Sequence, residues 1–270
     1  MASDPVTPFH PNRPEQNRPG TGELPPVGAI DIHCHILPGI DDGPETIEQA
    51  AALCRVMWRE GVTLAVATPH QLGRYELFND ASRVRSLVTQ LQEKLKQMRI
   101  GLEIRAGGEV RLDERIGRLL DEDRILTLAD RKKHVLIELP PGLSLEPDAV
   151  LPRVKASTAD AKVVLAHAER YDFIRKDAGA AQRWVDAGAI IQVNTGSLVG
   201  AYGPAEQACA WHLLSRGLVK IVASDAHNTT TRLPRWAEAL RLITSRLGAA
   251  VARAVCVENP RRIIDGESVE

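Results

Sequence analysis

The sequence predicts an α/β fold in which parallel strands close into a barrel, and three observations support this. Strand-like apolar runs alternate with amphipathic helical stretches seven times with no intervening linker. Several runs, such as Val163–Ala166 and Ile221–Ala223, are short and almost continuously apolar, which is typical of parallel strands buried on both faces. Most runs finish with His, Asp or Glu, and the active sites of parallel barrels lie at the carboxyl ends of the strands.

The expected strands start at intervals of about 30 residues, the length of one strand–helix unit with its loops. We place them at Ala29–His35, Leu64–His70, Glu103–Glu109, His134–Leu139, Lys162–His167, Ala189–Asn194 and Leu218–Asp225. Six of the seven carry a side chain of a metal-binding type at or next to their last residue. A random scatter of surface residues would not favour one end of the strands repeatedly.

The helices between these strands have recognisable boundaries. The stretch Pro44–Glu60 has apolar residues at helical spacing and is followed by Gly61 as a stop signal. Asn79 or Asp80 is a suitable N-cap for a second helix that runs towards Gly101. Further helices are expected at Pro204–Arg216 and Leu233–Leu247. No internal linker separates these units, so we expect residues 28–270 to form one domain.

The first 27 residues differ from the rest because they contain seven prolines and no apolar stretch of the kind found in secretory signal peptides. We expect a disordered, Pro-rich arm at 1–27. Such an arm is compatible with docking to a partner, although a passive tail is the simpler interpretation.

Composition excludes several functional classes. The net charge is −1, so no basic surface suggests a nucleic-acid partner. No run of 18 apolar residues is present, so we expect no membrane insertion. The four cysteines show no disulfide or C-x-x-C spacing, and reduced thiols in a cytoplasmic protein are the expected state.

The polar residues at the strand ends form the candidate metal site. Buried imidazoles and carboxylates are costly unless they are paired or bind a cation, so their collection at one end predicts a multinuclear metal centre. The candidate ligands are His33, His35, Asp42, His70, Glu109, Glu138, His167, Asp225 and His227.

The pattern at His33 and His35 carries the most information. Residues two apart on a strand point to the same face, so these two imidazoles can share one cation. Asp225 and His227 repeat this spacing on the last strand. Either pair alone is compatible with a structural role, and each glutamate alone with a salt bridge; their shared register favours metal binding.

Arg170 and Arg232 follow two of the ligand segments and are candidate catalytic residues. Each alone is more often a solvated arginine. Beside a cation cluster, their planar guanidinium groups suit phosphate oxygens. The remaining histidines, His10, His134 and His212, are expected to lie outside the site.

A competing pattern is Cys256 with Arg262, which has the C-x5-R spacing of cysteine-dependent phosphatases. The intervening segment has no glycine, and Pro260 lacks a backbone N–H that a phosphate-binding loop needs. Glu258 would also repel a phosphate, so a Cys256 nucleophile is disfavoured.

The segment Asp31–Pro44, with its H-C-H and D-D-G-P elements, resembles the opening motif of the PHP-domain (polymerase and histidinol phosphatase) superfamily. Its ending resembles the bacterial protein-tyrosine phosphatases of capsule and exopolysaccharide operons. Matching motifs follow in order, including T-P-H at 68–70, H-A-E-R at 167–170 and S-D-A-H at 224–227. The resemblance covers residues 29 to about 265 and implies a distorted, seven-stranded, TIM-like (β/α) barrel.

The resemblance implies three metal ions, of which Mn is favoured and Fe or Zn are open. The implied first site is His33, His35, Glu109 and Asp225. Glu109 bridges to a second site that Glu138 and His167 complete. The implied third site is Asp42, His70 and His227, and Arg170 and Arg232 face the substrate phosphate.

Metal ions lower the pKa of bound water from about 15.7 towards 7, so the expected reaction is attack by hydroxide on phosphorus without a covalent phosphoenzyme. The leading hypothesis is a phosphotyrosine-protein phosphatase that acts on a bacterial tyrosine kinase of polysaccharide synthesis. The alternatives are a phosphoesterase for a small metabolite such as histidinol phosphate and, less favoured, a nonhydrolytic regulatory protein. An amidohydrolase is disfavoured because no strand end offers a bridging lysine.

A homo-oligomer is compatible with Arg55 and Arg59 on one helix face, although a solvated face is the simpler interpretation.

Overall fold

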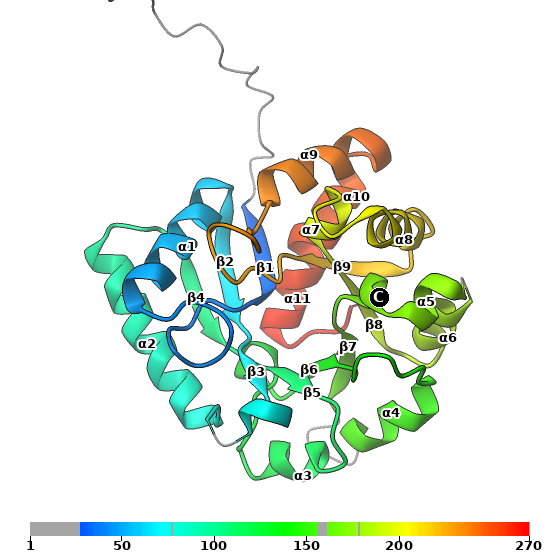
Figure 1. Ribbon diagram of the computed structural model, residues 1–270, viewed down its shortest axis with the longest axis horizontal. Helices are drawn as coiled ribbons and strands as arrows, with labels where there is room; N and C mark the ends of the chain where they lie inside the picture. Colours follow the sequence, from blue (N-terminus) through cyan, green and yellow to red (C-terminus); the bar gives the residue numbers. More distant parts are fainter. Residues whose placement is uncertain (1–27, 77, 156–160, 178, 270) are drawn as a thin grey trace, which may run out of the picture.

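The computed structural model describes residues 28–269 except 77, 156–160 and 178, so the expected arm at 1–27 lies outside the described residues. Strands and helices alternate along the chain, with strands in the centre and most helices around them (Figure 1). The strands are β1 Ala29–Cys34, β2 Val62–Ala67, β3 His70–Gln71, β4 Glu103–Ala106, β5 Glu109–Arg111, β6 His134–Glu138, β7 Lys162–Leu165, β8 Ile190–Asn194 and β9 Val219–Ala223.

The helices occupy the connections that the sequence predicts. They are α1 Ile47–Arg59, α2 Ala81–Gln97, α3 Ile116–Asp121, α4 Pro147–Lys155, α5 Asp172–Lys176, α6 Ala180–Asp186, α7 Thr195–Leu198, α8 Pro204–Ser215, α9 Trp236–Leu247, α10 Ala249–Arg253 and α11 Asn259–Asp265. Short 3₁₀ turns η1 Gly73–Tyr75, η2 Leu128–Asp130 and η3 Ala168–Arg170 and a π-helical turn η4 Ala254–Glu258 complete the described elements. None of these helices is long and apolar enough to cross a bilayer.

The capping residues account for two of the helix starts. The Thr46 hydroxyl accepts a hydrogen bond from Gln49 N at 3.2 Å and begins α1. Asp80, one of the two expected caps, accepts from Arg83 N at 2.8 Å and begins α2. The predicted helix at Leu233–Leu247 starts only at Trp236, because Arg235 has a left-handed backbone conformation (φ +50°).

The strands form two parallel sheets, one with the order β1-β2-β4 and one with the order β3-β5-β6-β7-β8-β9. The strands expected at 64–70 and 103–109 are each divided in two, which gives nine short strands among the described residues instead of seven. Pro69, which has no N–H, interrupts the first, and Gly107 with Gly108 interrupts the second. After these breaks the chain leaves the three-stranded sheet and pairs within the six-stranded one.

The free edge of β9 lies close to β1. Cys34 and Ala226 form an isolated parallel bridge, and His35 N donates to Ala226 O at 2.8 Å. Asp225 N donates to His33 O at 2.7 Å. The end of the first strand and the residues after the last strand are therefore fixed beside each other.

Two apolar layers surround the strands. The larger cluster lies between strands and helices, whereas the smaller one gathers residues from β1, β2 and β6–β9 together with Ile263 and Ile264 of α11. Figure 1 shows α11 among the strands rather than outside them. Because this smaller cluster fills the space on the inner side of the strands, polar side chains gather beyond their carboxyl ends.

The glycine pair at the break between β4 and β5 is required by close packing. A Cβ on Gly108 would lie 2.0 Å from Gln71 Oε1. Gln71 cannot move away cheaply because it is buried, donates to Asn79 O at 2.8 Å and accepts from Leu126 N at 2.8 Å.

We therefore expect Gly108→Ala to lower the free energy of unfolding by about 1–3 kcal/mol, the usual cost of overpacking. Urea denaturation measures this directly. Gly179→Ala is the matched control, because Gly179 is exposed, has a φ of −82°, and a Cβ there would come no closer than 3.3 Å to another atom. Equal stability of the two variants would contradict the packing argument.

Candidate metal centre

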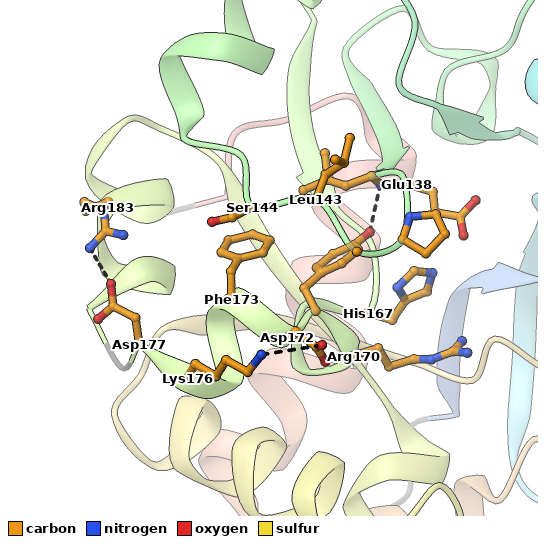
Figure 2. Close-up of a pocket in the computed structure, with 14 residues that line it drawn as sticks. Glu138, Leu143, Ser144, His167, Arg170, Asp172, Phe173, Lys176, Asp177 and Arg183 are labelled. Atoms are coloured by element: carbon orange, nitrogen blue, oxygen red, sulfur yellow. Dashed lines mark hydrogen bonds and ion pairs between the residues drawn. The ribbon is translucent and has the colours of Figure 1, made fainter.

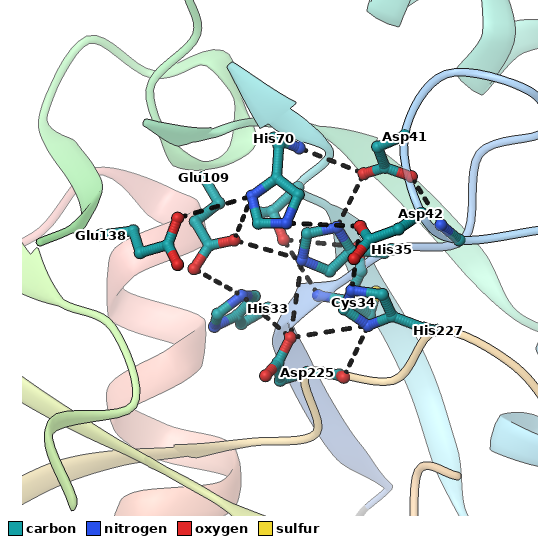
Figure 3. A network of polar contacts seen from close by, with 12 residues as sticks. His33, Cys34, His35, Asp41, Asp42, His70, Glu109, Glu138, Asp225 and His227 are labelled. Carbon is teal, nitrogen blue, oxygen red and sulfur yellow. Dashed lines mark hydrogen bonds and ion pairs between the residues drawn. The ribbon is translucent and has the colours of Figure 1, made fainter. Parts of the chain in front are cut away.

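The structure brings all nine predicted ligands together at the carboxyl ends of the strands, and Figure 3 shows eight of them in one polar network. They come from segments that span nearly two hundred residues of sequence. The five imidazoles belong to His33, His35, His70, His167 and His227, and the four carboxylates to Asp42, Glu109, Glu138 and Asp225.

Glu109 is the centre of this arrangement. Its side chain is 1% exposed, and its Oε1 lies 2.9 Å from His167 Nε2 and 3.3 Å from His33 Nε2. Its Oε2 lies 2.9 Å from His70 Nδ1 and 3.3 Å from His35 Nε2. Burial by itself raises the pKa of a carboxyl group, but the imidazoles of His33 and His70 outweigh it and hold the pKa of Glu109 well below its usual range.

His33 and His35 turn their Nε2 atoms to the same carboxylates, as their spacing predicts. Each of these atoms lies 3.5 Å from Asp225 Oδ1. A register shift between Asp31 and Cys34 accompanies this geometry, and the Cys34 side chain packs in the outer apolar cluster. The two rings therefore project into the site together while the residue between them points away.

A second group lies at the outer edge of the network. Asp42 Oδ1 is 3.3 Å from His70 Nε2 and 3.4 Å from His227 Nε2. Glu138 Oε2 lies 3.7 Å from His70 Nδ1 and 2.8 Å from Arg111 Nη2. His70 thus connects the deep carboxylate Glu109 with the shallower ones.

Backbone geometry helps to aim two of the ligands. His167 (φ +33°) and Asp225 (φ +52°) have left-handed conformations, which cost a non-glycine residue about 1–2 kcal/mol. Hydrogen bonds hold both in place, from His167 N to Gln192 Oε1 at 2.7 Å and from Asp225 N to His33 O at 2.7 Å.

Several donor atoms in this cluster have no hydrogen-bond partner although they are buried. They are the imidazole nitrogens His33 Nε2, His35 Nε2 and His227 Nε2. Unpartnered buried polar atoms are rare, and imidazole nitrogens facing carboxylate oxygens are the donor set that Zn, Fe and Mn accept. The residues present therefore fit a group of divalent cations.

Three sets of ligand atoms lie within 4.8 Å of one another: His35 with Asp42, His70 and His227; His33 with His35 and Asp225; and His70 with Glu109 and Glu138. These sets overlap with the three implied by the resemblance. They differ in three respects. His70 accompanies Glu109 and Glu138 where His167 was implied, although His167 Nε2 also contacts Glu109. Glu109 is absent from the set of His33 and Asp225, and His35 belongs to two sets.

Neighbouring charges and burial give the imidazoles of the cluster different pKa values. Burial lowers the pKa of His70, but Glu109 and Asp42 outweigh burial and raise it to about 11. Burial is likewise outweighed at His35, where Asp41 raises the pKa to about 9. At His227, burial together with the neighbouring His35 lowers the pKa to about 4. Without cations the carboxylates thus hold protons on His35 and His70.

Residues outside the predicted set orient the ligands. Asp41 Oδ2 lies 2.7 Å from His35 Nδ1 and accepts from His70 N at 3.1 Å. Gln192 Oε1 lies 3.1 Å from His33 Nδ1, and Asn194 Nδ2 donates to Asp225 Oδ2 at 2.9 Å. The sequence pointed to Asp41 and Asn194 only by position, and gave no signal for Gln192, because such partners are identified by tertiary contacts.

The two predicted arginines lie on the same carboxylate oxygen. Arg232 Nη2 is 2.8 Å and Arg170 Nη1 is 3.1 Å from Asp225 Oδ2. Both line a cavity of about 320 Å³ above the ligand cluster, together with Arg111, Arg74 and Tyr75. No sequence pattern pointed to these last three residues. Tyr75 stacks on His70 at 5.4 Å between ring centroids.

The competing sites lie elsewhere. Cys256 is fully buried in the apolar core, and burial raises the pKa of its thiol, so it is neither accessible nor ionised. All four cysteines are free. His134 begins β6, at the end of the strand away from the cluster, and His212 lies in α8.

Comparison with known proteins agrees with this geometry. A family model described as capsular polysaccharide synthesis, CpsB/CapC, matches residues 29–265. The tyrosine-protein phosphatase YwqE of Bacillus subtilis is 32% identical over 246 residues, which cover 89% of this chain and 93% of that protein. The tyrosine-protein phosphatase CpsB of Streptococcus pneumoniae is 30% identical, with 87% and 98% covered.

Solved structures extend the comparison. A crystal structure from work on YwqE and CpsB, described as unique metal-dependent tyrosine phosphatases, superposes with a TM-score of 0.82 at 31% identity and covers 89% of this chain and 96% of that one. The phosphotriesterase homology protein of Escherichia coli superposes with a TM-score of 0.53 at 13% identity, covering 88% and 99%, which shows a likeness of fold alone. The chain belongs to the CpsB/CapC family of capsular polysaccharide synthesis proteins.

Proposed function

We propose that this protein is a metal-dependent protein-tyrosine phosphatase, a phosphoric monoester hydrolase. The observation that carries the proposal is the cluster of five imidazoles and four carboxylates centred on Glu109, with two arginines on its open side. The named activity of the relatives YwqE and CpsB supports the same reaction.

We assign the metal ligands as the family resemblance implies, and several contacts in the site support this assignment. His33, His35, Glu109 and Asp225 would hold a first cation. Glu109 would also contribute to a second site, which Glu138 and His167 would complete. A third site consists of Asp42, His70 and His227. Mixed imidazole and carboxylate ligation suits Mn, which we favour over Fe or Zn.

Bound cations supply a water nucleophile at neutral pH and stabilise negative charge on the phosphoryl oxygens. The protein's own residues fix the geometry. Arg170 and Arg232 are placed to donate to the non-bridging phosphate oxygens, and the 320 Å³ cavity holds the phosphoryl group between them and the ligands. The bond from phosphorus to the tyrosine oxygen breaks, which releases phosphate and the phenol.

The leaving group favours an aryl phosphate. A tyrosine phenol has a pKa of about 10, so the tyrosine oxygen leaves phosphorus with less proton assistance than a serine oxygen needs. We propose that the substrate is a phosphotyrosine protein, in particular a bacterial tyrosine kinase of polysaccharide synthesis. The family's role in capsular polysaccharide synthesis supports this choice.

The finer features of the architecture are also proposals. We assign residues 28–270 to one domain with a distorted (β/α) barrel, supported by the Cys34–Ala226 bridge between β1 and the chain after β9. Four free cysteines support a cytoplasmic location.

Phosphate release from defined substrates tests the proposal. We expect metal-stripped protein to be inactive, and addition of Mn to restore hydrolysis of a phosphotyrosine peptide well above a phosphoserine peptide or histidinol phosphate. Preference for histidinol phosphate would identify the protein as a phosphoesterase for a small metabolite instead. Absence of Mn-dependent release from all three would favour a nonhydrolytic role.

Two substitutions separate metal chemistry from cysteine chemistry. We expect His33→Ala to lose bound metal and to reduce turnover by more than about 100-fold. This is a larger loss than the roughly 10- to 100-fold effect of removing a residue that only hydrogen-bonds to a metal ligand. Cys256→Ser should retain both metal and turnover. Elemental analysis and phosphate release measure these effects, and an inactive Cys256→Ser protein with its metal retained would contradict the mechanism.

Protons and metals should compete for His35 and His70. Their pKa values of about 9 and 11 in the folded, metal-free protein lie above the value of about 6.5 for a histidine in the unfolded chain. Protonation of these two imidazoles therefore stabilises the metal-free fold fully below about pH 6.5. This stabilisation is lost as the pH rises towards 9 and above. Bound Mn replaces these protons. The Tm difference between Mn-loaded and stripped protein should therefore grow by a few °C from pH 6.5 to 8.5. A difference that stays constant or shrinks over this range would contradict the competition.

A further inference from the structure

A second cavity, of about 680 Å³, opens beside the metal centre and shares Glu138, His167 and Arg170 with it (Figure 2). One wall is the connection from β6 to α4, residues 139–144, and the other is η3 with α5. Figure 2 shows His167 and Arg170 at one end of this cavity and Asp177 and Arg183 at the other. We call this cavity the Phe173 groove.

A row of rings runs from the metal centre along the groove. The ring of His167 lies 5.6 Å from that of Tyr171, and Tyr171 stacks on Phe173 at 5.8 Å with an interplanar angle of 24°. The Tyr171 hydroxyl accepts a hydrogen bond from Leu139 N at 2.9 Å, which ties the rings to the opposite wall. One side of the groove is therefore aromatic, although charged and polar residues such as Ser144, Asp172 and Lys176 also line it.

Leu143 forms part of the opposite wall and is unusually accessible. Its side chain is 52% exposed, and only Trp58 and Phe78 are comparable large exposed hydrophobic residues in the described part of the chain. Figure 2 shows Leu143 and Phe173 between the two ends of the groove. Leu143 and Phe173 together give the middle of the groove an apolar surface beside the ligand cluster.

Arg183, at the far end of the groove, is already paired with Glu146 at 2.8 Å and with Asp177 at 2.9 Å. Lys176 is exposed and lies 3.8 Å from Asp172, which is too far for a hydrogen bond. Leu143 and Phe173 are therefore the residues of the groove that would select an apolar side chain.

We propose that the Phe173 groove binds the residues that flank phosphotyrosine in the substrate polypeptide, with an apolar side chain held between Leu143 and Phe173. The inference rests on the proposed phosphatase function and adds a determinant of specificity. Arg170 stands where the phosphate pocket and the groove meet, so one chain can occupy both. The row of rings from His167 through Tyr171 to Phe173 is as long as about three residues of an extended substrate chain, at ~3.3 Å for each residue.

A third cavity on the other side of the centre is the competing location. It is lined by Phe78, Ile40 and Arg83 and has a volume of about 510 Å³. Arg74 and Tyr75 stand between it and the phosphate cavity, with the Arg74 guanidinium 4.7 Å above the Tyr75 ring. It shares no proposed metal ligand and neither of the two phosphate-binding arginines with the centre, so the groove is the better continuation.

Paired substrates test the inference on the Mn-loaded full chain. One phosphotyrosine peptide carries Leu at the second and third positions on both sides, a second carries Ser there, and free phosphotyrosine is the reference. We expect the wild-type protein to prefer the Leu peptide about tenfold in kcat/KM through KM, as one buried apolar group provides. Leu143→Ser and Phe173→Ala should reduce this preference to about twofold or less while hydrolysis of free phosphotyrosine is unchanged.

Phe78→Ala is the matched control, because Phe78 is 56% exposed at the rim but lies outside the groove. It should keep the full preference. The inference is overturned if the wild type shows no preference, if the preference survives Leu143→Ser, or if Phe78→Ala alone removes it. Misfolding of Phe173→Ala would appear as loss of free-phosphotyrosine hydrolysis, and Leu143→Ser then decides. A wild type that hydrolyses none of the three compounds contradicts the proposed function itself.

Discussion

The rest of the site depends on the buried carboxylate of Glu109. A charged glutamate that is 1% exposed is tolerated only when opposite charge surrounds it. Four imidazoles, those of His33, His35, His70 and His167, supply this environment within 3.3 Å. The carboxylate raises the proton affinity of its neighbours in the absence of cations, and both of its oxygens face imidazole nitrogens that could hold cations together with it. The same contacts thus explain both the pKa values and the fit to metal ions.

The position of Glu109 is set by the way the chain changes sheets. β4 pairs with β2, but after the two glycines the chain pairs as β5 with β3 and β6. Glu109 N donates to Pro69 O at 3.1 Å, so the two interrupted segments are joined at their breaks. Glu109 and His70 are paired in register directly after these breaks. The irregular backbone therefore places both side chains over the strand ends, where the ligands of β1 and β9 converge.

A layer of partners behind the ligands gives the site its rigidity. Asp41 holds His35 and the backbone of His70, while Gln192 connects His33 with His167. On the open side, Arg170 and Arg232 share one oxygen of Asp225, and Arg170 also borders the Phe173 groove. The segments 167–173 and 225–232 thus bring together the proposed metal ligands, the proposed phosphate contacts and one wall of the proposed peptide groove.

The sequence by itself determined the order of parallel strands and helices and the family, and it pointed to the nine candidate ligands that the structure gathers in one cluster, because apolar periodicity and short motifs are local properties. It predicted two uninterrupted strands where Pro69 and the pair Gly107–Gly108 divide them, since the effect of a proline or glycine on pairing depends on the neighbouring strand. Only the tertiary structure decided that His70 reaches Glu138 and that Asp41 and Gln192 orient the ligands. It alone brought Leu143 opposite Phe173 as well. These relations join residues distant in sequence, and they follow from the way the strands pack, which no local pattern encodes.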